Sequence, residues 1–288
     1  MSGLFGPETA KWSRDLFAPV MFAGCYAMIA ALFLASTVLL GLVRLPKPPA
    51  PALRNGGRRL VEIAAQPIFI IAALAGMVGY GVMSAVMTAT PIAMLGCGFD
   101  FAEAAFVIQW HALGMYVPSF VTGHLISRFG ITTILLTGAG LLLVCCGINL
   151  SGMTELNFWS ALVLLGIGWN FLFVGATTLL TRTYDSSEKA KVQALNDFLI
   201  FGTVAFSSFS SGALLTGFGW STVQLAILPF VLVAAAAAVW LKLHAWRAQA
   251  PRYVDCKPAT VWLPAECSSG MFRADLLPPC RAWRVFMF

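Results

Sequence analysis

The feature that most constrains this sequence is a series of seven apolar stretches, each roughly 20 residues or longer. A helix of about 20 apolar residues is long enough to cross the hydrocarbon core of a bilayer. The stretches are continuous rather than alternating, so they predict helices and not the strands of a membrane barrel. They cover residues 17–43, 67–95, 105–126, 131–150, 158–180, 192–218 and 222–243. We therefore predict an all-α integral membrane protein with seven transmembrane helices.

The composition agrees with this prediction. Hydrophobic residues make up 59% of the 288 residues and charged residues only 10%, whereas soluble domains contain about 25% charged residues. So much apolar surface requires lipid around it, so the lipid bilayer is the first expected partner. The net charge of +6 could suit a nucleic acid. However, the basic residues flank the apolar stretches, as topology signals do, and we expect no nucleic acid.

The charged residues between the spans predict the orientation. Asp100, Glu103 and Glu155 lie in connections without lysine or arginine, although Lys11 and Arg14 precede the first span. The alternate connections are basic and contain Arg44, Lys47, Arg54, Arg58, Arg59, Arg128, Arg182, Lys189, Lys191, Lys242, Arg247 and Arg252. Because positive charge resists translocation, we expect the basic connections in the cytoplasm. The N-terminus is then outside and the C-terminus cytoplasmic, in a membrane that we expect to be a bacterial inner (plasma) membrane.

Two segments outside the spans differ in composition. Residues 44–66 combine basic residues with four prolines, which keep a chain extended, and end in an amphipathic segment at residues 60–66. We predict a cytoplasmic linker there. Residues 246–288 contain five prolines, and their apolar residues follow no period. We predict that this tail is cytoplasmic and either disordered or loosely bound at the membrane interface.

The sequence lacks the residue patterns of an enzyme. It contains no H-E-x-x-H, no G-x-S-x-G and no phosphate-binding loop. The histidines, His111, His124 and His244, are widely separated, and the seven cysteines include no C-x-x-C pair. We therefore expect no catalytic residues, no cofactor, no metal site and no ATP-driven transport.

One short motif connects the third and fourth predicted spans. Residues 123–130 read Gly-His-Leu-Ile-Ser-Arg-Phe-Gly, which we interpret as a tight basic turn. It resembles the G-x-L-x-D-R-x-G signature of the major facilitator superfamily. The matching positions are Gly123, Leu125, Arg128 and Gly130, and Ser127 replaces the acidic residue. In that family the signature joins helices 2 and 3 and, in a looser form, helices 8 and 9 of twelve.

The resemblance implies a division of the chain. Residues 1–43 resemble the end of an N-terminal bundle, where Gly6-Pro7 is similar to the Gly-Pro that ends helix 5 in antiporters. Residues 44–66 are similar to the central cytoplasmic linker, and residues 67–245 to the C-terminal six-helix bundle. The chain would then correspond to helices 6 to 12, with the first five helices missing. Its partner would be a missing N-terminal bundle or a second copy of the chain.

The function implied is secondary transport of a small organic solute. Such transporters place the substrate between two bundles, and proton-coupled efflux is the direction that the Gly6-Pro7 motif favours. The alternative is a non-transporting fragment or a structural partner subunit of a split membrane complex.

Polar and aromatic side chains inside the spans are the candidates for contact with the solute, because polar groups in lipid are costly. His111 could exchange a proton near neutral pH or bond to the solute, or it could be a neutral histidine bonded to a neighbouring helix. By resemblance, helices 7 and 10 also line the cavity. The candidate set is Tyr80, Met83, Gln109, His111, Tyr116, Trp169, Asn170 and Phe173. This lining suits an amphiphilic solute, although aromatic stripes are also common packing surfaces.

A second candidate set lies near the cytoplasmic end of the sixth predicted span. Asn196 and Asp197 are polar residues within an apolar stretch. Asp197 could pair with Arg128 or Arg182 in a cytoplasmic gate, which is the interpretation that we favour. It could also accept the coupled proton, or it could be an acid near the positive end of a helix dipole.

Overall fold

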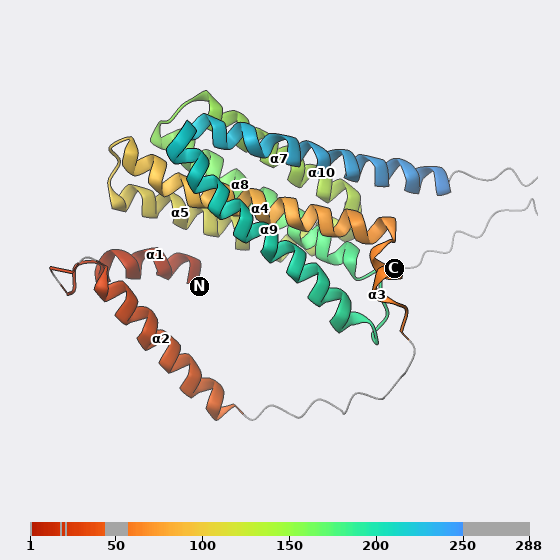
Figure 1. Cartoon of the computed structure of the whole chain (residues 1–288), viewed down its shortest axis with the longest axis horizontal. Coiled ribbons are helices and arrows are strands. Elements are labelled where there is room, and N and C mark those ends of the chain that lie inside the picture. The colour runs from red at the N-terminus through yellow and green to blue at the C-terminus, as the bar shows by residue number, and fades with distance from the viewer. Residues whose placement is uncertain (1, 18, 21, 44–56, 250–288) are drawn as a thin grey trace, which may run out of the picture. The chain divides into compact units, whose positions relative to one another are not determined.

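The computed structural model describes residues 2–17, 19–20, 22–43 and 57–249. Helices, turns and short connections account for all of these residues, and no strand occurs among them. Figure 1 shows the helices, which are α1 (Ser2–Ser13), α2 (Ala23–Leu42), α3 (Leu60–Ala64), α4 (Pro67–Gly96), α5 (Phe101–Tyr116), α6 (Ser119–Phe129), α7 (Ile131–Ser151), α8 (Glu155–Leu180), α9 (Lys189–Phe218) and α10 (Trp220–Gln249). Within the described residues, six helices are long and apolar enough to cross a membrane, and α5 with α6 forms a seventh if this bent pair is one span. The predicted all-α membrane fold is confirmed.

Five of the seven predicted spans correspond to single helices. The starts of α4 and α7 coincide with the prediction, and α8, α9 and α10 begin two or three residues earlier than predicted. The amphipathic segment of the linker contains α3. Helix α10 continues to Gln249, so the first residues assigned to the disordered tail are helical. The rest of that tail and residues 44–56 of the linker lie outside the described residues.

The start of the first predicted span is wrong. Helix α2 begins at Ala23, and a separate helix α1, which ends at Ser13 and contains Pro7, precedes it and was not predicted. The chain turns between the two helices. Phe22 has a φ of 67°, which is uncommon for a residue other than glycine. Its N–H donates to the carbonyl oxygen of Arg14 at 2.9 Å.

The third predicted span and the turn after it also need correction. The span is divided at Pro118 into α5 and α6, with a bend of 41°. Proline lacks an N–H, and its ring clashes with the carbonyl group four residues earlier, so a continuous helix is disfavoured there. The signature residues 123–129 are helical, not a turn. The chain reverses only at Gly130, whose φ of 84° favours glycine.

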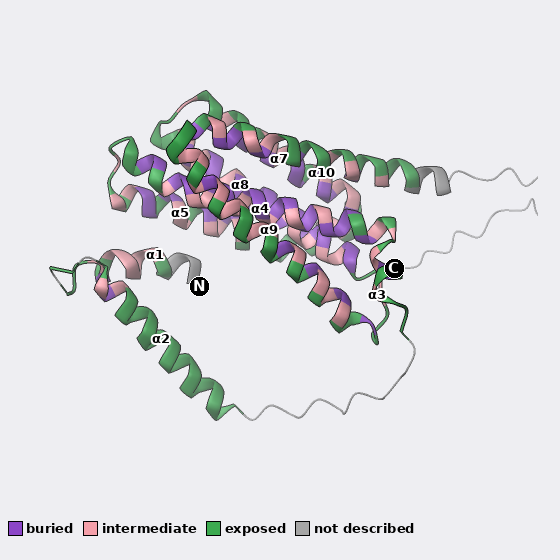
Figure 2. Ribbon diagram, viewed as in Figure 1, coloured by how far each residue is buried: buried purple, intermediate pink, exposed green. Residues whose placement is uncertain are grey.

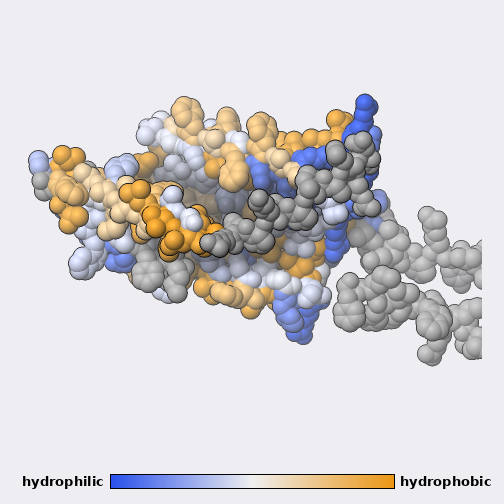
Figure 3. All heavy atoms as spheres, turned by 90° about the horizontal axis from the view of Figure 1, so that it is seen from below, coloured by the Kyte–Doolittle hydropathy of each residue, from blue (hydrophilic) through white to orange (hydrophobic). Residues whose placement is uncertain are grey.

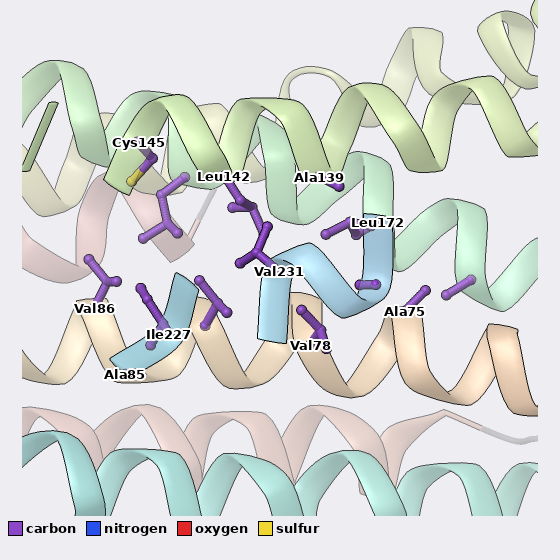
Figure 4. Close-up of a cluster of buried hydrophobic side chains, with 14 of the residues drawn as sticks. Ala75, Val78, Ala85, Val86, Ala139, Leu142, Cys145, Leu172, Ile227 and Val231 are labelled. Atoms are coloured by element: carbon purple, nitrogen blue, oxygen red, sulfur yellow. The ribbon is translucent and has the colours of Figure 1, made fainter. Parts of the chain in front are cut away.

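The core lies between α4, α7, α8 and α10. Figure 4 shows Val78 of α4, Leu142 of α7, Leu172 of α8 and Val231 of α10 pointing toward one another, and all four are buried. Figure 2 shows the same concentration of buried residues on α4 and α8. Small residues allow these helices to approach closely, as is common where lipid surrounds the bundle.

The apolar residues that remain exposed fit a lipid environment. Helix α2 is exposed from Tyr26 to Leu42 although its sequence is almost wholly apolar. Figure 3 shows hydrophobic residues over much of the face in view, with the most hydrophilic residues gathered mainly toward one end. A soluble protein rarely exposes such continuous apolar surface, so these faces are suited to contact with acyl chains.

Candidate substrate cavity

A cavity of about 390 Å³ lies between α4 and α5. This volume is within the range of about 300–1,000 Å³ typical of small-molecule sites. The lining residues are mostly apolar, with a few hydroxyl groups and one imidazole, and they are Met83, Ser84, Met87, Thr88, Ile108, His111, Ala112, Met115 and Tyr116. Three of the residues proposed from the sequence, Met83, His111 and Tyr116, are therefore brought together here.

His111 is the most buried polar residue of this lining, with 1% of its surface exposed. Its Nδ1 atom lies 2.9 Å from the carbonyl oxygen of Leu162 in α8. Its Nε2 atom is buried and has no hydrogen-bond partner among the described residues. The histidine is thus bonded to a neighbouring helix and also lines the cavity, and its role toward a solute or a proton stays a prediction.

An aromatic cluster forms on α4 and α8. The rings of Trp169 and Phe173 stack with their centroids 5.0 Å apart and an angle of 10° between their planes. Tyr80 meets both rings edge-on, at 5.1 Å and 5.2 Å. Such ring pairs contribute about 0.5–1.5 kcal/mol beyond the area they bury. The three predicted residues therefore lie together, but they are not part of the lining of the 390 Å³ cavity.

Asn170 connects α8 to the bend between α5 and α6. Its Nδ2 donates to the carbonyl oxygen of Met115 at 2.8 Å and to the hydroxyl of Ser119 at 2.5 Å. Its Oδ1 accepts from the hydroxyl of Thr122 at 2.7 Å. Both polar atoms of the Asn170 amide are therefore hydrogen-bonded within the protein. Gln109 also points elsewhere, because its Nε2 donates to the carboxylate of Glu8 in α1 at 2.8 Å.

The predicted gate residues lie near the start of α9 and in the connections. Asn196 is buried, Asp197 is exposed, and the amide of Asn196 donates to the Asp197 carboxylate at 3.4 Å. In the described part of the chain, no ion pair joins Asp197 to Arg128 or Arg182. The guanidinium of Arg128 lies 5.4 Å from the ring centroid of Phe129. Among the described residues, the gate ion pair therefore does not form in this conformation, and it stays a prediction.

A polar contact that the sequence did not predict joins the end of the linker to the connection before α9. The carboxylate of Glu188 accepts from the backbone N–H of Arg58 at 2.7 Å and from its Nη2 at 2.7 Å. The same Nη2 donates to the carbonyl oxygen of Thr183 at 3.0 Å, and Lys191 bonds to the carbonyl of Arg58. The Glu188 side chain is only 3% exposed. Because Glu188 lies 130 residues from Arg58, no local sequence pattern signals this pairing.

We call this contact the Arg58–Glu188 clamp, and it lowers the pKa of the Glu188 carboxyl group. Hydrogen bonds from Arg58 lower the pKa of Glu188 from its ordinary value of 4.5 to about 2. The carboxylate is therefore ionised throughout the physiological pH range. A permanently charged pair at this place suits a structural contact better than a proton carrier.

Comparison with known proteins identifies the family. Residues 9–204 match the sequence profile of the Major Facilitator Superfamily. The chain belongs to the Major Facilitator Superfamily. The family that the signature residues resemble is therefore confirmed.

Three known transporters are similar in sequence. The chain is 43% identical over 233 residues to the riboflavin transporter RfnT of Brucella anthropi, covering 80% of this chain and 58% of that protein. It is 34% identical over 157 residues to the uncharacterized MFS-type transporter YdeG of Bacillus subtilis, covering 53% and 36%. It is 31% identical over 206 residues to the uncharacterized MFS-type transporter YddS of the same organism, covering 67% and 46%. The chain thus spans less than two thirds of the length of each of these relatives.

Proposed function

We propose that this chain takes part in secondary transport of riboflavin or of a similar planar, amphiphilic heterocycle. The observation that carries the proposal is the 43% identity to a riboflavin transporter over 80% of the chain. The non-transporting alternative is not favoured, because the three similar proteins are all named as transporters.

The aromatic cluster and the cavity lining, which share no residue, both suit this class of solute. A flavin has a planar ring with an apolar face and polar edges. The aromatic cluster of Tyr80, Trp169 and Phe173 offers faces against which such a ring can stack. The half-buried Phe173 and Tyr80 are the members best placed for this contact. An apolar lining with few hydroxyl groups suits a flavin better than a sugar or an inorganic ion.

The domain organisation is part of the same proposal. Residues 67–245 would act as one six-helix bundle, with α5 and α6 together as one span. Transporters of this kind alternate access by rocking two bundles about a site at their interface. A second bundle, from another polypeptide or a second copy, would complete the path together with α2. We also propose proton coupling, an outward direction of transport and a bacterial inner membrane with the basic connections in the cytoplasm.

A binding measurement tests the proposal. The full chain in lipid nanodiscs is expected to quench riboflavin fluorescence in a saturable manner. Phe173→Leu is expected to weaken binding about three- to tenfold, because one stacking contact is lost. Phe106→Leu is the matched control, since Phe106 lies in a different aromatic pair with Trp110. Absence of saturable binding of riboflavin would exclude a flavin as the solute.

A further inference from the structure

We propose that a groove between α4, α9 and α10 binds an acyl chain of an anionic phospholipid. The groove has a volume of about 760 Å³, which is larger than that of the candidate substrate cavity. Its walls come from α4 between Leu74 and Ala85, from α9 between Phe198 and Leu214, and from α10 between Val223 and Phe230. The proposal is independent of which solute the transporter carries.

The groove follows from the way in which α9 and α10 are joined. Gly219, whose φ is 85°, links the end of α9 directly to the start of α10, so the two helices are close at this end. Figure 1 shows them diverging toward their other ends, with α4 between them. A Cβ atom on Gly202 of α9 would meet nothing within 4 Å among the described residues. Phe198 and Phe206, one turn to either side of this glycine, are exposed, so the glycine forms a notch between two rings.

The lining has little capacity to hydrogen-bond a polar solute. None of the lining residues is charged, and four of them carry a hydroxyl group. The hydroxyls of Thr203 and Ser207 donate to carbonyl groups of their own helix, at 2.8 Å and 3.1 Å. The hydroxyl of Ser211 donates to the carbonyl oxygen of Ala85 on α4 at 2.6 Å. A flavin in this groove would leave polar groups unpaired, which is costly, whereas an acyl chain has no polar group to satisfy.

The groove lies on a different face of α4 from the residues proposed to bind the solute. Tyr80 and Met83 are spaced i, i+3 and share one face, while the groove residues between Leu74 and Ala85 recur on another. The hydroxyls of Ser84 and Ser208 lie 2.5 Å apart and join α4 to α9 beside the cavity. In the one-bundle organisation proposed above, a second bundle meets this one around the solute site. A face turned away from that site is therefore suited to contact with lipid.

Lipid can reach the groove along surfaces that are already exposed. Helices α9 and α10 are both long and apolar enough to cross a membrane. Their apolar side chains beside the groove are exposed, as Phe209 of α9 and Leu225 of α10 illustrate. The groove is thus continuous with the lipid-facing surface. If it stayed empty, the atoms of its walls would lose dispersion contacts on that side, so a flexible apolar chain is stabilised there.

The end at which α9 and α10 diverge carries basic side chains that suit the phosphate group of the lipid. Lys189 at the start of α9 and Lys242 near the end of α10 are exposed, and neither forms an ion pair within the described residues. Lys189 precedes Phe198 by about two and a half turns, roughly 14 Å. The exposed acid Asp197 is turned by about 100° around the helix from Phe198. Basic residues beside membrane helices attract anionic head groups, so we expect the head group at this end and the acyl chain in the groove.

A substitution that fills the groove tests the proposal. Ala226 lines the groove from α10, and the indole ring of Ala226→Trp is expected to occupy the space. Ala205→Trp is the matched control, because Ala205 is exposed on α9 and is not part of the lining. The full chain is reconstituted with phosphatidylglycerol, transferred to a mild detergent and measured by native mass spectrometry. We expect the wild type and the control to retain one phospholipid, and Ala226→Trp to retain it at least about fivefold less often.

The masses of the complexes also identify any other occupant. Displacement of the phospholipid by added riboflavin would assign the groove to the solute and overturn the proposal. A two-chain species that is lost only in Ala226→Trp would assign it to a second copy of the chain, with the same consequence. Equal lipid retention by the three folded proteins, or no retention by the wild type, would also overturn it. Lack of riboflavin binding would refute the proposed function and leave this test unaffected.

A measurement on the wild type needs no substitution. Phosphatidylglycerol with a diazirine in its acyl chain is irradiated in nanodiscs that contain the full chain, and the labelled peptides are mapped. Helix α2, whose apolar residues are exposed, is the reference for contact with passing lipids. We expect at least about threefold more label per residue on the groove segments of α9 and α10, because a bound chain stays longer. Equal labelling would refute a bound lipid. If Ala226→Trp does not fold, Ser210→Phe fills the groove from α9 instead.

Discussion

At the residue scale, two side chains that the sequence places in one candidate set have different roles in the structure. Both nitrogen and oxygen of the Asn170 amide are bonded to the protein, at the bend between α5 and α6. The Nε2 atom of His111 is not bonded within the described residues. The Asn170 amide therefore serves the fold, whereas the His111 ring keeps one buried nitrogen without a partner among the described residues.

This difference predicts how Asn170 responds to substitution. Asn170→Leu removes three hydrogen bonds that join α8 to the bend, and it is expected to destabilise the folded chain by about 1–3 kcal/mol. The order of preference among flavin analogues is expected to stay the same. Thermal unfolding and ligand competition in detergent measure the two effects. Thr177→Val is the control, because the Thr177 hydroxyl bonds only to carbonyl groups of its own helix.

Asp197 allows a second prediction at this scale, for a form of the transporter that is active. If the carboxylate pairs with Arg182 in another conformation, Asp197→Asn should shift the balance between inward-open and outward-open states. The pH dependence of transport should stay largely intact. Accessibility of single cysteines to labelling reports the balance of states. Loss of gradient-driven transport with preserved solute exchange would instead identify Asp197 as the proton carrier.

At the element scale, close helix packing and one polar contact hold the helices in place. Gly114 and Gly166 let α5 touch α8, while Gly138 and Gly168 do the same for α7 and α8, where a Cβ on Gly138 would lie 2.9 Å from the Gly168 carbonyl oxygen. Helix α8 is therefore fixed on two sides. The Arg58–Glu188 clamp adds a polar contact, and it links the end of the linker to the start of α9.

The clamp is expected to persist in mild acid. The pKa of Glu188 is lowered from 4.5 to about 2 in the folded chain, so its stabilising contribution is present above about pH 4.5 and is lost as the pH falls toward 2. Hydrogen exchange of residues 57–59, corrected for the intrinsic rate, should be equally protected at about pH 7 and about pH 5. Glu188→Gln should remove this protection at both values. Asp185→Asn, an exposed acid in the same connection, should not, and equal protection in both variants would refute a structural role for the clamp.

At the scale of the whole molecule, the alternation of basic and acidic connections predicts the topology. A reporter inserted after Arg182 is expected in the cytoplasm, and one inserted after Phe99 is expected on the outside. The reason is that positive charge resists translocation. A cytoplasmic reporter after Phe99 would contradict the proposed number of spans between Pro67 and Gly130.

Transport by the isolated chain provides a second test at this scale. Alternating access requires two bundles, so the chain reconstituted alone is expected to bind riboflavin but to carry none across the membrane of proteoliposomes. Gradient-driven flux by the purified chain would contradict the one-bundle proposal, unless cross-linking shows that two copies form the active unit. Cross-linking of the reconstituted chain is therefore part of the experiment.

The sequence by itself determined the membrane class, the starts of five helices to within three residues, and the family. Length and continuity of apolar segments are local properties, and a bilayer imposes one length on them. The signature residues Gly123, Arg128 and Gly130 supported the family assignment, although the helical conformation of most of that motif was not foreseen. The bend at Pro118 could also have been predicted, because proline disfavours a continuous helix. We predicted one unbroken span because the apolar run continues through the proline.

Only the tertiary structure decided which polar groups meet. His111 and Leu162 are 51 residues apart, and Arg58 and Glu188 are 130 residues apart. No periodicity connects residues at such separations, because their contact depends on how closely two helices pack. For His111, that distance is determined by the absence of side chains at Gly114 and Gly166. The sequence therefore identified the histidine as a candidate, and the packing of α5 against α8 determined which of its nitrogens bonds to the neighbouring helix.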